Sequence, residues 1–426
     1  MTEQISSAQA QPGTHKGQPI GTREFILMMA ALMAMNALSI DPMLPALPDI
    51  GRDLDVAHPN DRQMLITVYF AGFGLGSLFY GPLSDRYGRR PVLLISIAMF
   101  VAATAMCALS PSFAVILAAR LASGFFASST RVVVTGIVRD RFHGDRMASV
   151  MSLIFIIFMV VPIVAPSYGQ LVLTVAPWRW IFWSLAFTGC AIWLWVLRRL
   201  PETLTPENRV GIGVSSLLRT FREVVTHRVA IGHMVASGVV MAGLVGFITS
   251  VQQIFFDVFD ARAIFPFAFA GIAIWMAVGS FFNSRLVIQV VARRMSQGAL
   301  IALTMLSALH SLLIWRGHET LPMFMLFQSA TMLCFAFAGA NFSAISLEPF
   351  GRGAGLASSL QSALSSLLAA LLGSAIGSSF DGTTLPLSLG FLIFSMAALL
   401  IVAWAENWRL FRRPGLSHLR EPSPPR

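Results

Sequence analysis

Twelve apolar runs recur between residues 24 and 408, and they constrain this chain more than any other feature. A helix rises 1.5 Å per residue, so a run of about 20 residues crosses the ~30 Å hydrocarbon core of a bilayer. The bilayer core offers no water to the backbone, which leaves helices and closed barrels as the structures that can span it. Runs of this length predict an all-α membrane protein.

The predicted spans form two groups of six. The first group covers residues 24–46, 62–82, 91–109, 113–138, 147–173 and 178–200, and the second covers 229–256, 264–284, 297–315, 321–346, 354–380 and 385–408. This pattern predicts twelve transmembrane helices in two six-helix bundles, at residues 24–200 and 229–408. A polar linker at 201–228 joins them, with an amphipathic helix expected near Ser215–Val225, and the tails are 1–23 and 409–426. Two related bundles joined by a long loop are typical of transporters.

The charged residues predict the orientation of the chain. Only 12% of the residues are charged, against about 25% in soluble proteins. The net charge is +10, but 23 of the 30 basic residues fall in segments that one orientation places on the cytoplasmic side. This positive-inside bias predicts that both termini are cytoplasmic and that the chain contacts a lipid bilayer, with no nucleic acid as a partner. The first run is too long for a signal peptide, so we expect it to be retained.

Neither an enzyme nor a cofactor site is predicted. The three cysteines all lie within apolar runs, where they are expected to pack as small hydrophobic residues. His233 and His310 are isolated, so no metal site is predicted, and no phosphate-cradling loop is present.

The strongest local motif is "GPLSDRYGRR" at residues 81–90. Asp85 can accept hydrogen bonds from the N-terminus of a neighbouring helix, where the helix dipole favours an anion. The arginines can pair with acids such as Asp140, at the end of the fourth span. The candidate residues of this conformational-switch loop are Gly81, Asp85, Arg86, Gly88, Arg89, Arg90 and Asp140. A faint second copy, "FFNSRLVIQVVARRMSQGAL", follows the eighth span but lacks the acid and the glycines.

This order of residues is that of the signature loop of the major facilitator superfamily. The chain resembles its twelve-helix drug:proton antiporters of the bicyclomycin/chloramphenicol-resistance branch (Bcr/CflA type). The other segments that carry the resemblance are "SIDPMLPALPDIGRDL", "ARLASGFFASS", "VPIVAPSYGQ", "RRLPETL" and "LEPFGRGAGLASSLQ". The resemblance implies the major facilitator fold, a bacterial inner membrane location, a monomer, and a proton-driven exporter with a central cavity that opens alternately to either side.

The chain departs from the family's pattern at three places. Pro42 and Met43 follow the first-span aspartate where an aromatic residue is usual, Ser77 replaces a common glutamine, and Gln170 replaces a glycine. These differences leave the fold expectation unchanged but weaken any inference about the substrate.

Asp41 is the only clear carboxylate inside a predicted span. A charge at the centre of a membrane helix costs about 2.5–3.5 kcal/mol on insertion scales, and less toward its ends. We interpret Asp41 as the group that carries the proton. The alternative is an interfacial aspartate that reaches water, helped by Pro42 and Pro45.

Two arginines lie in the fourth span. Arg120 lies at a depth comparable with that of Asp41, and the resemblance implies that the arginine of "ARLASG" takes part in proton coupling. A structural ion pair between the first and fourth spans is the alternative. Arg131 follows 11 residues later, about three turns, and so shares the helix face of Arg120. Arg131 either lines the cavity, which would favour anionic or zwitterionic substrates, or snorkels to water.

The fifth span carries Pro162, Pro166 and Gly169 in "VPIVAPSYG". The resemblance implies an antiporter motif that closes the outer end of the cavity; an ordinary proline kink is the alternative. Polar residues within apolar spans are the candidate substrate-cavity residues, namely Asn36, Tyr69, Arg131, Gln252, Gln253 and Asn341.

The sequence therefore predicts a proton-driven antiporter that exports a small organic compound, with the substrate and protons as its partners. One alternative is a symporter or an exporter of an organic anion or metabolite. A membrane sensor that binds a ligand without transporting it is less favoured, because no substantial soluble output domain is evident.

Overall fold

A computed structural model describes residues 20–209 and 214–411 of the chain. Twelve helices in this part are long and apolar enough to cross a membrane, and the secondary structure is helical throughout the described elements. The predicted all-α class and number of spans are confirmed. Most of the two predicted tails, at 1–19 and 412–426, and residues 210–213 of the linker lie outside the described residues.

The twelve long helices divide six and six. The first bundle contains α1 (Thr22–Leu38), α3 (Met64–Tyr87), α4 (Arg89–Leu109), α5 (Phe113–Arg141), α6 (Gly144–Val175) and α7 (Arg179–Arg199), and the second contains α9 (Arg228–Gln253), α10 (Phe265–Val290), α11 (Ala292–Trp315), α12 (Leu321–Leu347), α13 (Ala354–Ser378) and α14 (Leu385–Ala405). Short helices connect them: η1 (Asp41–Ala46), α2 (Leu47–Asp53), η2 (Pro59–Gln63), η3 (Pro206–Asn208), η4 (Ile254–Val258), η5 (Arg262–Ile264) and η6 (Glu348–Gly353).

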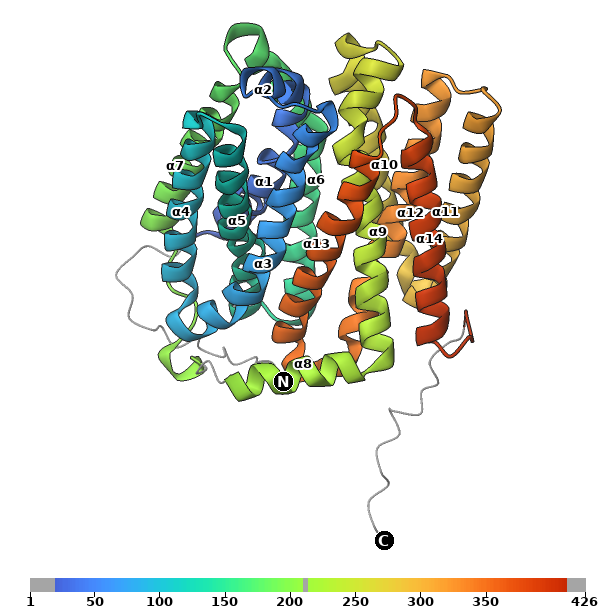
Figure 1. The fold of residues 1–426 in the computed structure, drawn as a ribbon. Helices are drawn as coiled ribbons and strands as arrows, with labels where there is room; N and C mark the ends of the chain where they lie inside the picture. Colours follow the sequence, from blue (N-terminus) through green and yellow to red (C-terminus); the bar gives the residue numbers. More distant parts are fainter. Residues whose placement is uncertain (1–19, 210–213, 412–426) are drawn as a thin grey trace, which may run out of the picture.

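The two bundles stand side by side and meet through α3 with α13 and α6 with α10 (Figure 1). Glycines on α3 allow this close approach. A Cβ at Gly74 would lie 2.9 Å from Cγ of Leu367, and one at Gly81 would lie 2.5 Å from Oγ of Ser359. Small residues take this role in membranes because association there depends on packing rather than on exclusion of water.

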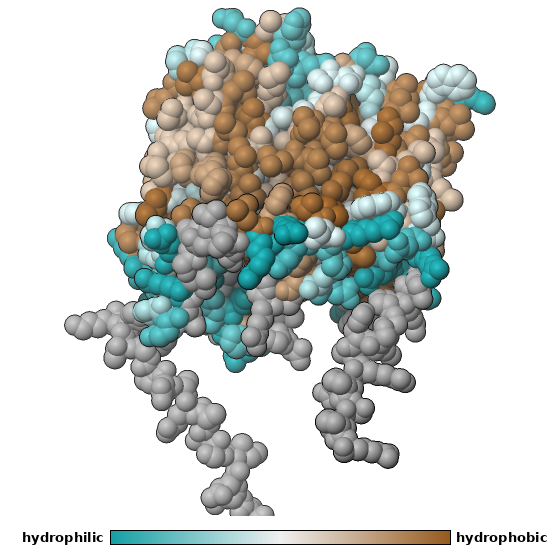
Figure 2. All heavy atoms as spheres, turned by 60° about the horizontal axis from the view of Figure 1, so that its bottom comes forward, coloured by the Kyte–Doolittle hydropathy of each residue, from teal (hydrophilic) through white to brown (hydrophobic). Residues whose placement is uncertain are grey.

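The amphipathic helix predicted in the linker is present as α8 (Val214–Thr226), which lies across the ends of the membrane helices (Figure 1). We call this side of the molecule the linker face and the opposite side the far face. Val224 is buried in a cluster with Met234 and Ala357, whereas Leu218 and Phe221 are exposed. Figure 2 shows a broad apolar belt that ends at a polar rim on the linker face, as expected at a membrane boundary.

The first span is not the continuous helix that its apolar run predicts. Helix α1 ends at Leu38, and the chain continues as η1 and then α2. Pro42 has no N–H to donate to the carbonyl of Leu38, so the helical ladder stops there. The break places Asp41 at the first position of η1 and frees carbonyl groups that need other donors.

Candidate functional site

Asp41 lies buried at the break of the first span. The residue is only 5% exposed, and it makes no ion pair within residues 20–209 and 214–411. Helix α6 covers it from one side, since a Cβ at Gly169 would lie 1.9 Å from the carbonyl oxygen of Pro42. Pro166 is also buried, and Pro162 is half-buried on the same helix. The proline and glycine motif of the fifth span, on α6, therefore packs directly on the segment that carries the carboxylate.

Arg120, on α5, also contacts the break of the first span. Its Nη1 donates to the carbonyl of Ser39 at 2.9 Å and its Nε to the carbonyl of Leu65 at 3.1 Å. The guanidinium carbon lies 4.4 Å from the centre of the Tyr69 ring. Its Nη2 is buried without a hydrogen-bond partner in the described part of the chain. Arg120 and Asp41 thus flank the break, but no ion pair joins them in this conformation.

The neutral polar candidates fall into separate groups. Asn36 donates to Oγ1 of Thr130 at 3.0 Å and accepts from the Tyr69 hydroxyl at 3.3 Å, which links α1, α5 and α3. In the second bundle, Asn341 donates to Oδ1 of Asn283 at 2.7 Å between α12 and α10. The structure therefore does not gather all the predicted cavity residues in one place.

Gln253 belongs to a set of contacts between the bundles at the far face. Its Nε2 donates to Oδ1 of Asn60 at 2.9 Å, and its Oε1 accepts from Nε2 of Gln63. Asn60 also donates to the carbonyls of Ser378 at 3.1 Å and Phe380 at 3.0 Å. We call these five residues the far-face clasp. A cleft of about 550 Å³ opens beside it.

Asn60 and Gln63 were not predicted as site residues, because polar residues at the end of a span normally face water. Gln252, the neighbour of Gln253, is buried at 2% exposure and makes no clasp contact among the described residues.

We expect Gln253→Ala to open the far face. The substitution removes two hydrogen bonds of about 1 kcal/mol each, enough to shift a two-state equilibrium by up to about 30-fold. Pulsed electron paramagnetic resonance between spin labels at Arg52 and Asp381, in a background without native cysteines, would show a larger population of long distances. Gln252→Ala is the matched control and should leave the distribution unchanged. An unchanged distribution in Gln253→Ala would show that the clasp does not hold the bundles together.

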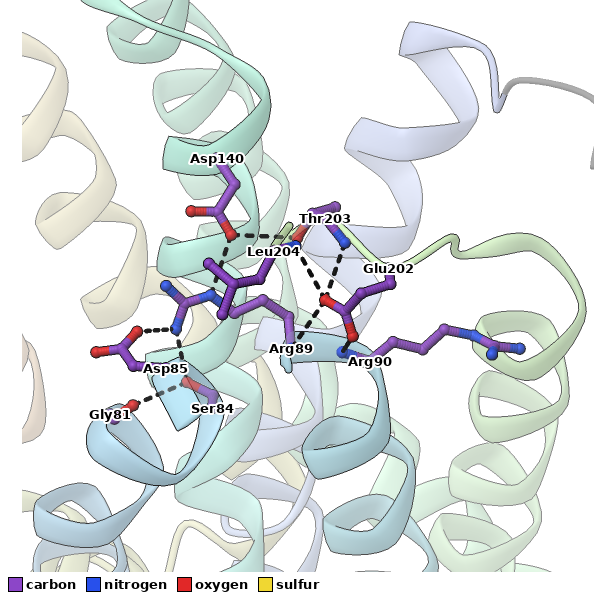
Figure 3. Close-up of polar contacts among 9 residues, drawn as sticks. All are labelled: Gly81, Ser84, Asp85, Arg89, Arg90, Asp140, Glu202, Thr203 and Leu204. Atoms are coloured by element: carbon purple, nitrogen blue, oxygen red, sulfur yellow. Dashed lines mark hydrogen bonds and ion pairs between the residues drawn. The ribbon is translucent and has the colours of Figure 1, made fainter. Parts of the chain in front are cut away.

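The predicted switch loop forms a polar network at the linker face (Figure 3). Arg89 lies at its centre: Nη1 is 2.5 Å from Oδ1 of Asp85, and Nε is 3.0 Å from Oδ2 of Asp140. Nη1 also donates to Oγ of Ser84 at 2.7 Å. Arg90 instead donates to the carbonyl of Leu197 at 2.7 Å. The structure therefore brings Asp85, Arg89 and Asp140 together, whereas Arg86 makes no ion pair within the described residues.

Glu202 completes this network and was not predicted as part of it. Its carboxylate accepts from the backbone N–H groups of Arg89 at 3.0 Å and Arg90 at 3.1 Å, at the start of α4 (Figure 3). An anion at a helix N-terminus is favoured by the helix dipole and by the unpaired N–H groups there. Gly88 makes room for it, because its φ is +101° and a Cβ would lie 2.6 Å from Oε2 of Glu202.

A corresponding ion cluster lies in the second bundle. Arg293, near the start of α11, contacts Oε1 of Glu406 at 2.9 Å and Oε2 of Glu348 at 3.0 Å. Glu348 follows α12 as Asp140 ends α5, and Glu406 follows α14 as Glu202 follows α7. The second copy of the loop lacks the acid in its own sequence. Glu348 and Glu406, which are distant along the chain, therefore supply the carboxylates that pair with Arg293.

Val291 precedes α11 in the position that Gly88 has before α4, and it keeps the same kind of backbone at φ +71°. A β-branched residue in this sparsely populated backbone region is strained by about 1–3 kcal/mol. We expect Val291→Gly to raise the free energy of unfolding by about 1 kcal/mol, after the entropy that glycine adds to the unfolded state. The midpoint of thermal unfolding should rise by about 2 °C. Val290→Gly, inside α10, is the control and should lower the midpoint; a fall for Val291→Gly as well would contradict the strain.

Comparisons with known proteins agree with this geometry. A model of the Major Facilitator Superfamily matches residues 26–371. A bicyclomycin resistance protein homolog of Haemophilus influenzae is 30% identical over 277 residues, which cover 65% of this chain and 69% of that protein. The multidrug resistance protein MdtL of Escherichia coli is 35% identical over 179 residues, covering 42% of this chain and 46% of MdtL.

Solved structures share the fold at low identity. The human organic anion transporter MFSD10 (TETRAN) is 19% identical with a TM-score of 0.66, covering 91% of this chain and 100% of that one. A D-xylose-proton symporter is 12% identical with a TM-score of 0.71, covering 88% and 97%. The resemblance drawn from the switch loop is confirmed, and the protein is a multi-pass membrane protein rather than an enzyme. The chain belongs to the major facilitator superfamily of membrane transporters.

Proposed function

We propose that this protein is a proton-driven antiporter that exports small organic compounds by alternating access. The observation that carries the proposal is a buried carboxylate, Asp41, at a break in a membrane helix and without an ionic partner in the described part of the chain. A carboxylate at such a place is costly and marks a proton pathway more often than a structural contact. The names of the bicyclomycin and multidrug resistance relatives support export of drug-like compounds.

The arrangement suggests how the proton would be exchanged. In this conformation the far-face clasp joins the bundles and α6 packs on the Asp41 segment, so Asp41 holds its proton away from far-face water. When a compound binds from the linker face, Asp41 would release its proton to linker-face water, and the carboxylate would be stabilised by the unpartnered Nη2 of Arg120. When the far face then opens, a far-face proton would bind Asp41 as the compound leaves. The protonated protein would return to the present conformation, so that protons move inward as the compound moves outward.

The switch loop would change its contacts during this cycle. It lies at the linker face, which we assign to the cytoplasmic side of a bacterial inner membrane. Asp85 is the exposed member of the Arg89 network, with 45% of its side chain exposed, whereas Asp140 is 16% exposed. Asp85 is therefore the member that can leave when the two bundles rock, while Arg89 and Asp140 stay paired. Both termini and the linker would lie on this cytoplasmic side, as the charge distribution predicts.

Transport by the purified protein in liposomes tests the proposal. Uptake of bicyclomycin or chloramphenicol should be driven when the liposome lumen is more acidic than the outside, because protons leave as the compound enters. Uptake should not be driven by the reverse gradient, and it should stop when nigericin collapses the gradient. Uptake at a rate independent of the pH gradient would contradict proton coupling. Movement of protons and compound in the same direction would identify a symporter instead.

A further inference from the structure

Arg131 is exposed although it lies well inside α5, 11 residues beyond Arg120. Eleven residues are about three turns, so both side chains leave α5 on one face. At the level of Arg120 this face is closed by Ser39 of α1 and by Leu65 and Tyr69 of α3. At the level of Arg131 the same face reaches solvent-accessible space.

The neighbours of Arg131 show that this space is not lipid. On one side, Thr130 is bonded to Asn36 of α1. On the other side, Val132 lies 4.0 Å from the Cβ position of Gly81 on α3, where Ser359 of α13 also packs. Arg131 therefore leaves α5 between α1 and the contact of α3 with α13, toward the interior where the two bundles face each other.

The guanidinium of Arg131 has no carboxylate within ion-pair distance in residues 20–209 and 214–411. The other arginines inside the fold are engaged: Arg120 binds two carbonyls, and Arg89 binds two carboxylates. Five fixed N–H donors match the geometry of a carboxylate, sulfonate or phosphate group. Inside a protein, where the dielectric is lower than in water, such a group is attracted more strongly.

We propose that Arg131 binds an anionic group of the transported compound, so that this transporter selects organic anions over cations. The inference rests on the proposed transport function and names its substrate class. The side chains of Thr130 and Asn36 beside it are neutral, so Arg131 supplies the positive charge at this level of α5.

Three naphthalene compounds test the selectivity, because they share a ring and differ in charge at neutral pH: naphthalene-2-sulfonate is negative, naphthalene-2-sulfonamide is neutral and 2-naphthyltrimethylammonium is positive. Binding to the full-length protein in detergent is measured by isothermal titration calorimetry, without a pH gradient. The sulfonate should bind at least about tenfold more tightly than the other two, as expected for one charge-assisted contact. Arg131→Gln should remove this preference, Arg131→Lys should keep part of it, and Arg131→Glu should reverse it toward the ammonium compound.

Arg285→Gln is the matched control, because Arg285 is an exposed arginine on α10 without an ion pair in the described residues. It should leave all three affinities unchanged. Equal binding of the three compounds, no binding of the sulfonate, or a preference that survives Arg131→Gln would overturn the inference and indicate a side chain that only reaches toward linker-face water. Because the binding assay uses no gradient, loss of proton-driven transport in liposomes with the sulfonate preference intact would count against the proposed coupling alone.

Discussion

Asp41→Asn is expected to abolish proton-driven transport while leaving the fold and compound binding largely intact. Asparagine has nearly the same shape as the buried carboxyl but cannot exchange a proton at physiological pH, so the two bundles would lose the group that couples their movement to the gradient. Gradient-driven uptake of bicyclomycin, chloramphenicol or naphthalene-2-sulfonate into liposomes should fall at least about 100-fold, a loss of roughly 2.7 kcal/mol of coupling. Binding measured in detergent, at a pH low enough to keep Asp41 of the wild type protonated, should change by less than about threefold, because asparagine mimics the protonated carboxyl.

Proton release gives a second readout for the same variant. Adding the same compounds to weakly buffered, detergent-solubilised wild-type protein should release protons, and Asp41→Asn should release none. Asp49→Asn is the matched control, since Asp49 lies in the same span but is 44% exposed and paired with Arg52 at 2.6 Å. Undiminished release in Asp41→Asn would place the proton site elsewhere and leave Asp41 as a residue of the helix break.

The sequence predicted the membrane helices well because one physical requirement sets them. Each span must satisfy its own backbone within the hydrocarbon core, so length and composition alone locate it. The break of the first span at Ser39 was harder to predict. Pro42 indicated a weak point, but prolines are tolerated inside membrane helices, and α6 contains Pro162 and Pro166 without ending there. Whether a proline breaks a helix depends on the neighbours that take up the freed carbonyls, here Arg120.

Contacts between distant parts of the chain could not be predicted in the same way. Glu202 and Glu406 follow the last helix of each bundle, where an acid normally has only water around it. Glu202 accepts from the backbone N–H of Arg89 and Glu406 from the side chain of Arg293, in each case 113 residues away along the chain. Gln253 was expected in the substrate cavity but lies in the far-face clasp, because an amide inside a span can meet a neighbouring helix as easily as a ligand. The pairing of a switch-loop arginine with Asp140 was predicted and is present, whereas the contacts that depend on the meeting of the two bundles were not predicted.

Gly169→Val is expected to be the most damaging single change in α6. Any Cβ at this position would lie 1.9 Å from the carbonyl oxygen of Pro42 and 2.8 Å from its Cα. Both are backbone atoms, so no side chain can turn aside, and η1 would have to move away from α6. Since η1 begins with Asp41, the displacement would admit water to the carboxylate and weaken the closure of the far face.

We expect gradient-driven transport to be lost in Gly169→Val and the midpoint of thermal unfolding to fall by several degrees, whereas Gly169→Ala should show a smaller loss of the same kind. Overpacking in a tight contact costs about 1–3 kcal/mol. Gly339→Val on α12 is the matched control, because a Cβ there meets nothing within 4 Å. If Gly169→Val folds poorly, Gly169→Ala still tests whether α6 keeps water away from Asp41. A larger proton leak through liposomes that contain Gly169→Ala would support this role of α6. A tight membrane with normal transport in that variant would show that α6 packs on the break without sealing it.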